Sequence, residues 1–262
     1  MAALSDNDRR LVLITGASMG IGREAALMFA QHGDRVVAVA RGRERLDELA
    51  RRHEAIVPLT ADVADADSMS EMARRTLEDC GVPDVVVANA GIGLDALFAE
   101  TTDEALRRLF EVNVVGMFRT VRPFLPGMLA RGSGRVLLVS SIVGKRGIPH
   151  YSGYSASKFA LHGAADALRS ELWGSGVSVG IVCPGSTETG FQEHALRSGT
   201  PQKRVRPVRH PPASVARALL SMADSRRRER ILGAESKLMA FVDTLAPAVV
   251  DWVLARMLTG KR

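Results

Sequence analysis

Short apolar runs alternate with longer amphipathic stretches along most of the chain. The apolar runs are rich in Val, Ile and Leu, and they predict strands at 11–15, 35–40, 55–62, 84–91, 134–141 and 176–185. The stretches between them predict helices at 23–33, 43–53, 66–81, 103–130 and 154–173. Strands that are apolar throughout are typical of parallel sheets covered by helices on both faces. We therefore expect an α/β fold with a doubly wound parallel sheet.

The alternation loosens after residue 190. Glycine and proline are frequent at 190–212, which predicts an irregular segment, and 190–215 is interpreted as the lid of a substrate site. A helix at 213–223 and a short strand at 230–234 are predicted to follow. No internal repeat or linker interrupts the chain before this point, so a single domain fits the pattern better than two.

The last predicted element is an amphipathic tail at 238–258, which Pro247 is expected to break into two helices. Its apolar residues recur at broadly helical spacing, and they are Leu238, Phe241, Leu245, Val249, Trp252, Val253 and Leu254. Such a stripe can cap an apolar pocket, pack on a second subunit or lie on a membrane, and packing in the core or on a subunit is favoured. Residues 1–262 are thus expected to form one domain with a C-terminal helical extension at 235–262.

Composition and charge narrow the classes of partner. The net charge is +6, and much of the excess lies in two runs, 201–210 and 226–230. Neither run interleaves aromatic residues, which favours a solvated face over nucleic-acid binding, and membrane contact is not favoured either. The two cysteines, Cys80 and Cys183, show no metal-ligand spacing, so no metal is expected. No apolar run has spanning length, and a cytoplasmic protein is expected.

A glycine-rich turn follows the first predicted strand. The segment TGASMGIG places Gly16, Gly20 and Gly22 between a strand and a helix, where glycine permits positive φ and a close approach of the backbone to a pyrophosphate. This position in an alternating chain is typical of Rossmann-like dinucleotide sites. The candidate cofactor contacts in the turn are Gly16, Ser18, Met19, Gly20, Ile21 and Gly22.

The end of the second strand indicates which dinucleotide binds. An acidic residue there selects NAD, but this chain has Ala40 followed by Arg41, whose guanidinium suits a 2′-phosphate. NADP(H) is therefore favoured, and NAD(H) is possible. Asp62 and Val63 end the third strand where the adenine edge passes, and the NAG segment, Asn89, Ala90 and Gly91, ends the fourth strand beside the cofactor.

Both tyrosines of the chain lie in the segment YSGYSASK. Tyr154 and Lys158 are four residues apart on a predicted helix, hence on one face. A lysine ammonium one turn away is expected to lower the pKa of the phenol, which then exchanges a proton with a carbonyl or alcohol oxygen during hydride transfer. Tyr151 has Ser155 at the corresponding position, so Tyr154 is the candidate acid/base and Tyr151 is expected at the mouth of the substrate pocket.

The ordered motifs TGASMGIG, NAG, Val112–Asn113, Ser140–Ser141, YSASK and PGSTET resemble those of the short-chain dehydrogenase/reductase family, in its branch of about this chain length. The resemblance covers about residues 8–190 and implies a Rossmann-like fold with Asn113, Ser141, Tyr154 and Lys158 as catalytic residues. In the family, Asn113 holds a relay water, and the serine lies 13 residues before the tyrosine, as Ser141 does; Ser140 is the alternative. The loop after the sixth strand would hold the nicotinamide through Pro184, Gly185, Thr187 and Thr189.

The sequence defines the substrate less closely than the cofactor. Segments 92–98, 142–151 and 190–215 are expected to line the pocket, and their mostly apolar residues include Ile92, Leu94, Ile142, Val143, Ile148, His150, Tyr151, Phe191 and His194. Substrate contacts are predicted for Ser141, Val143, Tyr151 and Phe191. A hydrophobic ketone, aldehyde or secondary alcohol is favoured, and a homodimer or homotetramer is expected. The alternatives are a non-catalytic nucleotide-binding scaffold or sensor, an NAD-preferring dehydrogenase, and a binder of nucleic acid or membrane through the basic runs.

Overall fold

The computed structural model describes residues 9–191, 195–198 and 209–259, with side chains described up to residue 257. Its central sheet has the order β3-β2-β1-β4-β6-β7-β9, and all neighbouring strands are parallel. The strands are β1 (Leu11–Thr15), β2 (Arg35–Ala40), β3 (Ile56–Thr60), β4 (Val85–Ala88), β6 (Gly134–Val139), β7 (Val177–Cys183) and β9 (Glu229–Ile231). This arrangement confirms the predicted α/β class and the doubly wound sheet.

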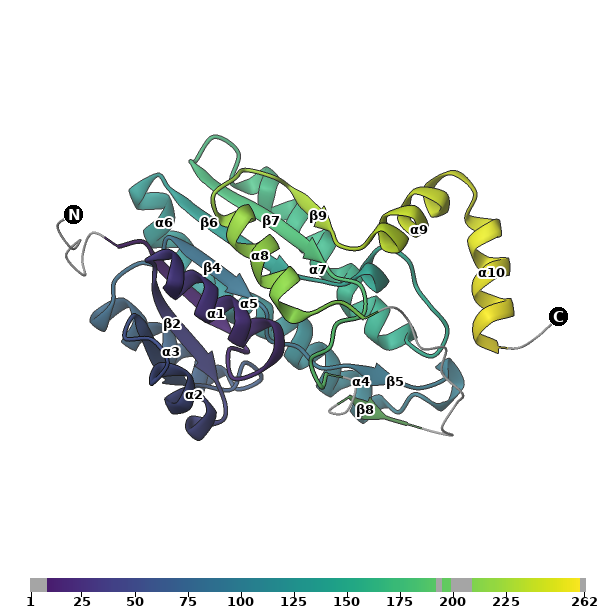
Figure 1. Ribbon diagram of the computed structural model, residues 1–262, viewed down its shortest axis with the longest axis horizontal. Helices are drawn as coiled ribbons and strands as arrows, with labels where there is room; N and C mark the ends of the chain where they lie inside the picture. Colours follow the sequence, from purple (N-terminus) through teal and green to yellow (C-terminus); the bar gives the residue numbers. More distant parts are fainter. Residues whose placement is uncertain (1–8, 192–194, 199–208, 260–262) are drawn as a thin grey trace.

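Helices cover both faces of the sheet (Figure 1). The first part of the chain contributes α1 (Gly20–His32), α2 (Arg43–Ala50), α3 (Ala66–Asp79), α4 (Asp103–Phe110), α5 (Gly116–Val121) and α6 (Leu125–Arg131). The second part contributes α7 (Ser152–Glu171), α8 (Pro212–Ala223), α9 (Ala234–Leu245) and α10 (Pro247–Thr259). Pro247 begins α10, so the predicted break of the tail into two helices is confirmed.

Alternating residues of each strand supply two separate apolar cores. On β1, Leu11 and Leu13 pack with residues of α3, α5 and α7, whereas Val12 and Ile14 pack with α1, α2 and α8. Side chains point to opposite faces with a period of two, so a strand buried on both faces needs apolar residues at every position. That requirement explains why the continuous apolar runs predicted the sheet correctly.

The region predicted as one helix at 103–130 is divided into several segments. After α4 the backbone widens into a π-helical turn, Glu111–Val115, and a 3-10 turn, Arg122–Phe124, separates α5 from α6. Pro123 and Pro126 lack the amide hydrogen that a continuous α-helix needs, which accounts for the second interruption. The other 3-10 turns are Phe98–Glu100 and Ile142–Gly144.

A second, two-stranded sheet lies beyond the carboxyl ends of the central strands. It joins β5 (Leu94–Asp95) to β8 (Leu196–Arg197), and no sequence pattern predicted it because each strand has only two residues. β8 lies in the segment interpreted as a lid, whose residues 192–194 and 199–208, including His194, fall outside the described residues. The division into one domain with a lid and a tail stays a prediction.

Candidate active site

The carboxyl ends of β1, β4, β6 and β7 meet at one edge of the sheet. This edge carries the glycine turn after β1, Asn89 after β4, Ser141 after β6 and Pro184 after β7. In an open parallel sheet, ligands bind outside these strand ends where the order of the strands reverses, here between β1 and β4. The predicted site residues, separated by up to about 170 positions in the chain, are therefore brought together at the point where a dinucleotide binds in such folds.

The glycine turn needs its glycines for close internal packing as well as for conformation. Gly16 and Gly20 have φ of 70° and 53°. A Cβ on Gly22 would lie 2.3 Å from the carbonyl oxygen of Gly16, so a side chain there would push α1 away from β1. A Cβ on Gly20 would lie 2.9 Å from Cβ of Thr189, which places the loop after β7 directly against the turn.

The amino-terminal end of α1 suits a phosphate. Within the described residues no side chain caps this end of the helix, and its first turn carries no acidic residue. The free amide hydrogens and the positive end of the helix dipole are thus available to an anion. Ser18, Met19 and Ile21 are half-buried in the same turn. The turn therefore fits the pyrophosphate of a dinucleotide.

Asn89 holds the glycine turn in place. Its side-chain amide donates to the carbonyl of Thr15 at 2.9 Å, and the amides of Asn89 and Ala90 approach the Thr15 hydroxyl at 3.3 Å. The sequence indicated Asn89 as a cofactor contact but did not single out Thr15. A threonine at the end of a buried strand is common, so no local signal identified this role.

Arg41 lies at the end of β2 with 66% of its side chain exposed. Its Nη1 atom is 3.9 Å from Oδ2 of Asp62, and Nη2 of Arg108 lies 3.6 Å from the same oxygen. The other carboxylate oxygen of Asp62 accepts from the amide of Ala64 at 3.0 Å. An exposed guanidinium with one loose partner can turn toward a phosphate. Val63, by contrast, is buried against Gly116 of α5.

Tyr154 and Lys158 share one face of α7, with Nζ of Lys158 5.8 Å from the centroid of the tyrosine ring. Burial raises the pKa of Tyr154 well above its ordinary value, although a hydrogen bond with the Ser141 side chain acts in the opposite direction. Burial also lowers the pKa of Lys158 to about 8. The predicted lowering of the phenol pKa is therefore wrong in direction, because desolvation outweighs the stabilisation of the phenolate.

The two serines after β6 have different partners. The Ser140 hydroxyl is buried and donates to the backbone carbonyl of Lys158 at 3.1 Å, so it fixes α7 against the sheet. The Ser141 hydroxyl approaches the carbonyl of Pro184 at 3.4 Å, accepts from the amide of Val143 at 3.3 Å, and is bonded to Tyr154. Of the two alternatives, Ser141 is therefore the one beside the phenol.

Asn113 lies in the π-helical turn and links the loop after β4 to α7. Its side chain accepts from the amide of Ile92 at 2.8 Å, donates to the carbonyl of Ile92 at 3.0 Å, and donates to the Ser157 hydroxyl at 3.0 Å. Gly91 lies between this amide and Lys158, since a Cβ there would be 3.2 Å from Oδ1 and 3.4 Å from Nζ. Asn113 thus positions the loop that borders the lysine.

Aromatic and apolar groups lie around the phenol of Tyr154. The rings of Tyr154 and Phe191 have centroids 5.7 Å apart, and Phe191 also packs over Gly93. Tyr151 precedes α7 and forms a β-bridge with Ala96, and its phenol contributes to the raised pKa of Tyr154. Three of the predicted substrate residues, Ser141, Tyr151 and Phe191, are therefore gathered around Tyr154, and buried Val143 contacts Ser141.

The loop after β7 closes the site from the other side. The Pro184 carbonyl accepts from the amide of Ile142 at 2.8 Å, and the Thr187 hydroxyl donates to the carbonyl of Gly185 at 3.2 Å. Thr189 packs on Gly20, as described above. All four residues predicted to hold the nicotinamide thus lie on a loop that runs from the serine to the glycine turn.

His150 has an unusual conformation beside the site. Its φ is 69°, a value that residues other than glycine rarely adopt, and its carbonyl accepts from the amide of Ala96 at 2.9 Å. The Nδ1 atom is buried and has no hydrogen-bond partner among the described residues. The sequence predicted His150 only as part of the pocket lining, and nothing local indicates its backbone conformation.

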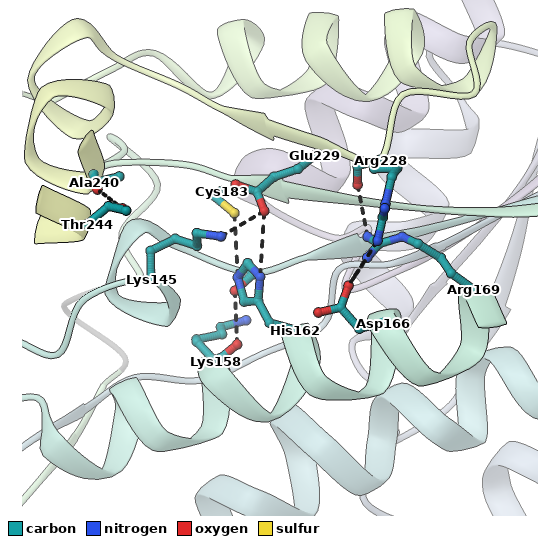
Figure 2. A network of polar contacts seen from close by, with 11 residues as sticks. Lys145, Lys158, His162, Asp166, Arg169, Cys183, Arg228, Glu229, Ala240 and Thr244 are labelled. Carbon is teal, nitrogen blue, oxygen red and sulfur yellow. Dashed lines mark hydrogen bonds and ion pairs between the residues drawn. The ribbon is translucent and has the colours of Figure 1, made fainter.

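A separate polar network lies on α7 beyond Lys158 (Figure 2). One turn further, His162 lies 3.7 Å from the Cys183 sulfur and 3.9 Å from the Glu229 carboxylate, which also pairs with Lys145 at 2.9 Å. Burial lowers the pKa of His162 to about 4, so the imidazole is neutral at pH 7. The network joins α7 to β7 and β9 behind the site.

A parallel sheet whose carboxyl edge carries a glycine turn and a Tyr–Lys pair on one helical face defines an oxidoreductase that uses a nicotinamide dinucleotide. Residues 10–198 match the short chain dehydrogenase family, and the chain belongs to this family. Ketoacyl reductase HetN of Nostoc sp. is 31% identical, with 92% of this chain and 87% of the relative covered.

Solved structures agree with this assignment. A short-chain dehydrogenase from Streptomyces avermitilis has a TM-score of 0.84 at 31% identity, covering 95% of this chain and 97% of its own. A short-chain dehydrogenase from Sphingobium yanoikuyae in complex with NADPH has a TM-score of 0.78 at 28% identity, covering 92% and 96%. In the described part of this chain, no helix is both long and apolar enough to cross a bilayer, and no cluster of three metal-ligating side chains is found.

Proposed function

We propose that this protein is an NADP(H)-dependent oxidoreductase that interconverts an apolar carbonyl compound and its alcohol. The observation that carries the proposal is the grouping of Tyr154, Ser141 and Lys158 at the strand ends beside the glycine turn. A bound nicotinamide dinucleotide supplies or accepts the hydride. The chain's own residues then have to bind the substrate oxygen and move one proton.

In the direction of reduction, Tyr154 is the proton donor. Its raised pKa keeps the phenol protonated over the whole neutral range, which suits an acid and makes the isolated phenolate costly. As the O–H bond breaks, the proton passes to the carbonyl oxygen and the negative charge stays on the phenolate. The Lys158 ammonium, 5.8 Å from the ring centroid, stabilises that charge.

Ser141 assists at the same oxygen. Its hydroxyl is bonded to the phenol, so an oxygen bound beside Tyr154 also lies within reach of Ser141. A donor aimed at a developing oxyanion stabilises the transition state more than the ground state. We assign Asn113 a positioning role, because its three bonds hold the loop at Ile92 against α7.

Arg41 supports the preference for NADP(H). Its guanidinium is mostly exposed and shares Asp62 loosely with Arg108, so a 2′-phosphate can compete for it. The NADPH bound by the Sphingobium yanoikuyae protein and the ketoacyl reductase activity in the name of the Nostoc relative are consistent with this proposal. Phe191 and Val143 favour an apolar substrate.

The proposal is tested with purified protein, NADPH and a panel of aromatic and aliphatic ketones and aldehydes. Oxidation of NADPH, followed by its fluorescence, is expected with at least one apolar member. NADPH binding without turnover across the panel would instead favour a nucleotide-binding scaffold. The Tyr154→Phe variant serves as the background control for chemical oxidation.

A further inference from the structure

The C-terminal helices present an apolar surface to solvent. Figure 1 shows α9 and α10, in yellow, standing to one side of the sheet and its covering helices. Seven large apolar side chains on these two helices are between 36% and 69% exposed. We call them the C-terminal stripe, and they are Leu238, Phe241, Leu245, Val249, Trp252, Val253 and Met257. The favoured prediction was packing in the core or on a subunit; the exposure rules out the core of this chain, and packing on a subunit stays a prediction.

Two of the three acidic side chains on these helices, Asp243 and Asp251, are turned away from the stripe, and the third, Glu235, is held by His210 at 2.6 Å. Asp243 lies about half a turn from Phe241 and Leu245 on α9, and Asp251 lies on the side of α10 opposite Arg256. Both carboxylates pair with Arg146, at 2.7 Å for Asp243. Both carboxylates are thus directed toward the body of the protein and away from the stripe.

Cationic side chains, in contrast, lie within the stripe. Lys237 precedes Phe241 by four residues and shares its face of α9. Arg256 follows Trp252 by four residues, and its guanidinium stacks 5.4 Å from the centroid of the indole ring. Each helix therefore presents apolar groups with one positive charge among them.

A cationic groove extends the stripe toward the body of the protein. Its volume is about 380 Å³, and its lining includes Arg227, Arg230 and Lys237. Glu229 also lines it, but that carboxylate is paired with Lys145 at 2.9 Å. Among the described residues, none of the three cations has an ion-pair partner, so they are available to phosphate or carboxylate groups of a partner.

We propose that the C-terminal stripe docks on the surface of an anionic lipid membrane. Apolar residues with an aromatic anchor enter the headgroup region, and cations among them bind lipid phosphates and carboxylates. A second copy of this chain fits the stripe less well. In a two-fold contact the stripe would meet itself, so Lys237 and Arg256 would face a surface of the same charge, and the nearby acid Glu235 is already held by His210 at 2.6 Å.

The docked surface adjoins the substrate side of the site. Arg146 ties both helices to the turn that follows Ser141, and Glu235 at the start of α9 lies 2.6 Å from His210, which bridges to Thr187. If the proposed function holds, an apolar substrate dissolved in the bilayer would reach the site by a short path. Membrane docking itself does not depend on that function.

The test is cosedimentation of the full chain with vesicles. We expect binding to vesicles of equal parts phosphatidylcholine and phosphatidylserine, and weaker binding to phosphatidylcholine alone or at high salt. The double variant Phe241→Ser/Trp252→Ser is expected to lower the bound fraction about tenfold. Lys237→Glu/Arg256→Glu is expected to remove the preference for phosphatidylserine.

One matched double variant controls for exposed aromatic residues, and thermal melting controls for folding. Phe98 and Trp173 are 85% and 91% exposed outside the C-terminal helices, and Phe98→Ser/Trp173→Ser should bind vesicles like the parent chain. Unchanged thermal melting of all variants excludes unfolding as the cause. Absence of binding to either vesicle overturns the proposal. Light scattering gives a second outcome that overturns the proposal. If the parent chain is a stable dimer and the Phe241→Ser/Trp252→Ser variant is a monomer, the stripe is covered by a second copy of the chain.

Discussion

Nζ of Lys158 lies 5.8 Å from the ring centroid of Tyr154, one turn away on α7, and its ammonium donates to the carbonyl of Val139 at 2.9 Å. The lysine is therefore held by the end of β6 while its charge faces the ring. This anchoring keeps the charge in place as the phenol gives up its proton. It also holds the lysine at a fixed position relative to the end of β6, from which Ser141 projects.

Replacement of Tyr154 by Phe removes the proton donor and leaves the ring. We expect kcat to fall by about 10³-fold while the Kd for NADPH stays within about threefold. Tyr151→Phe is the matched control, since it removes the neighbouring phenol, and it should alter KM for substrate more than kcat. Steady-state kinetics and NADPH fluorescence titration measure both. Loss of kcat in the Tyr151 variant with activity retained in the Tyr154 variant would reverse the roles.

The pH profile of reduction should show one falling limb on the alkaline side. Burial lowers the pKa of Lys158 to about 8, so its ammonium predominates below that pH and is lost above it. The raised pKa of Tyr154 keeps the donor protonated throughout. We therefore expect kcat to decline as pH rises through about 8.

Lys158→Arg is the control for this assignment. A guanidinium does not titrate in this range, so whatever rate the variant retains should lack the limb near pH 8. Measurement of kcat in buffers of constant ionic strength separates the two profiles. A limb that persists unchanged in the Arg variant would mean that another group titrates.

Arg41→Asp should change the choice of cofactor. The substitution replaces a cation by an acceptor, and loss of a charge-assisted hydrogen bond of about 1.5–3 kcal/mol corresponds to a change of about 10- to 100-fold. We expect the ratio of kcat/KM for NADPH to that for NADH to fall by this factor. Arg43→Asp is the control, because Arg43 is already paired with Asp47 at 2.9 Å. An equal effect of both variants would indicate a general charge effect.

Gly22→Ala should damage the glycine turn. The added Cβ would meet the Gly16 carbonyl at 2.3 Å, which forces α1 and the turn apart at a cost of about 1–3 kcal/mol in the free energy of unfolding. Dinucleotide affinity should fall as well. Gly163→Ala in α7 is the matched control: nothing lies within 4 Å of its added Cβ, and stability should rise by roughly 0.5–1 kcal/mol. Urea unfolding and NADPH titration measure both variants.

Much of the fold was predictable because parallel strands buried on both faces need unbroken apolar runs. β1 and β2 were predicted at their observed bounds, whereas the run at 84–91 overshot β4, which ends at Ala88. The chain leaves the sheet at Asn89 because its amide turns to hold Thr15. That interaction joins residues 74 positions apart, so local sequence patterns cannot predict it.

The alternating fold, the glycine turn, and the placement of Tyr154 and Lys158 on one helical face follow from local sequence patterns, because each depends on neighbours within about one helical turn or strand. Three features required the three-dimensional arrangement: Ser141 and not Ser140 contacts the phenol, burial raises the pKa of that phenol, and the C-terminal stripe is exposed. These features depend on desolvation and on contacts between distant segments. Local periodicity shows which residues are apolar, but not what covers them.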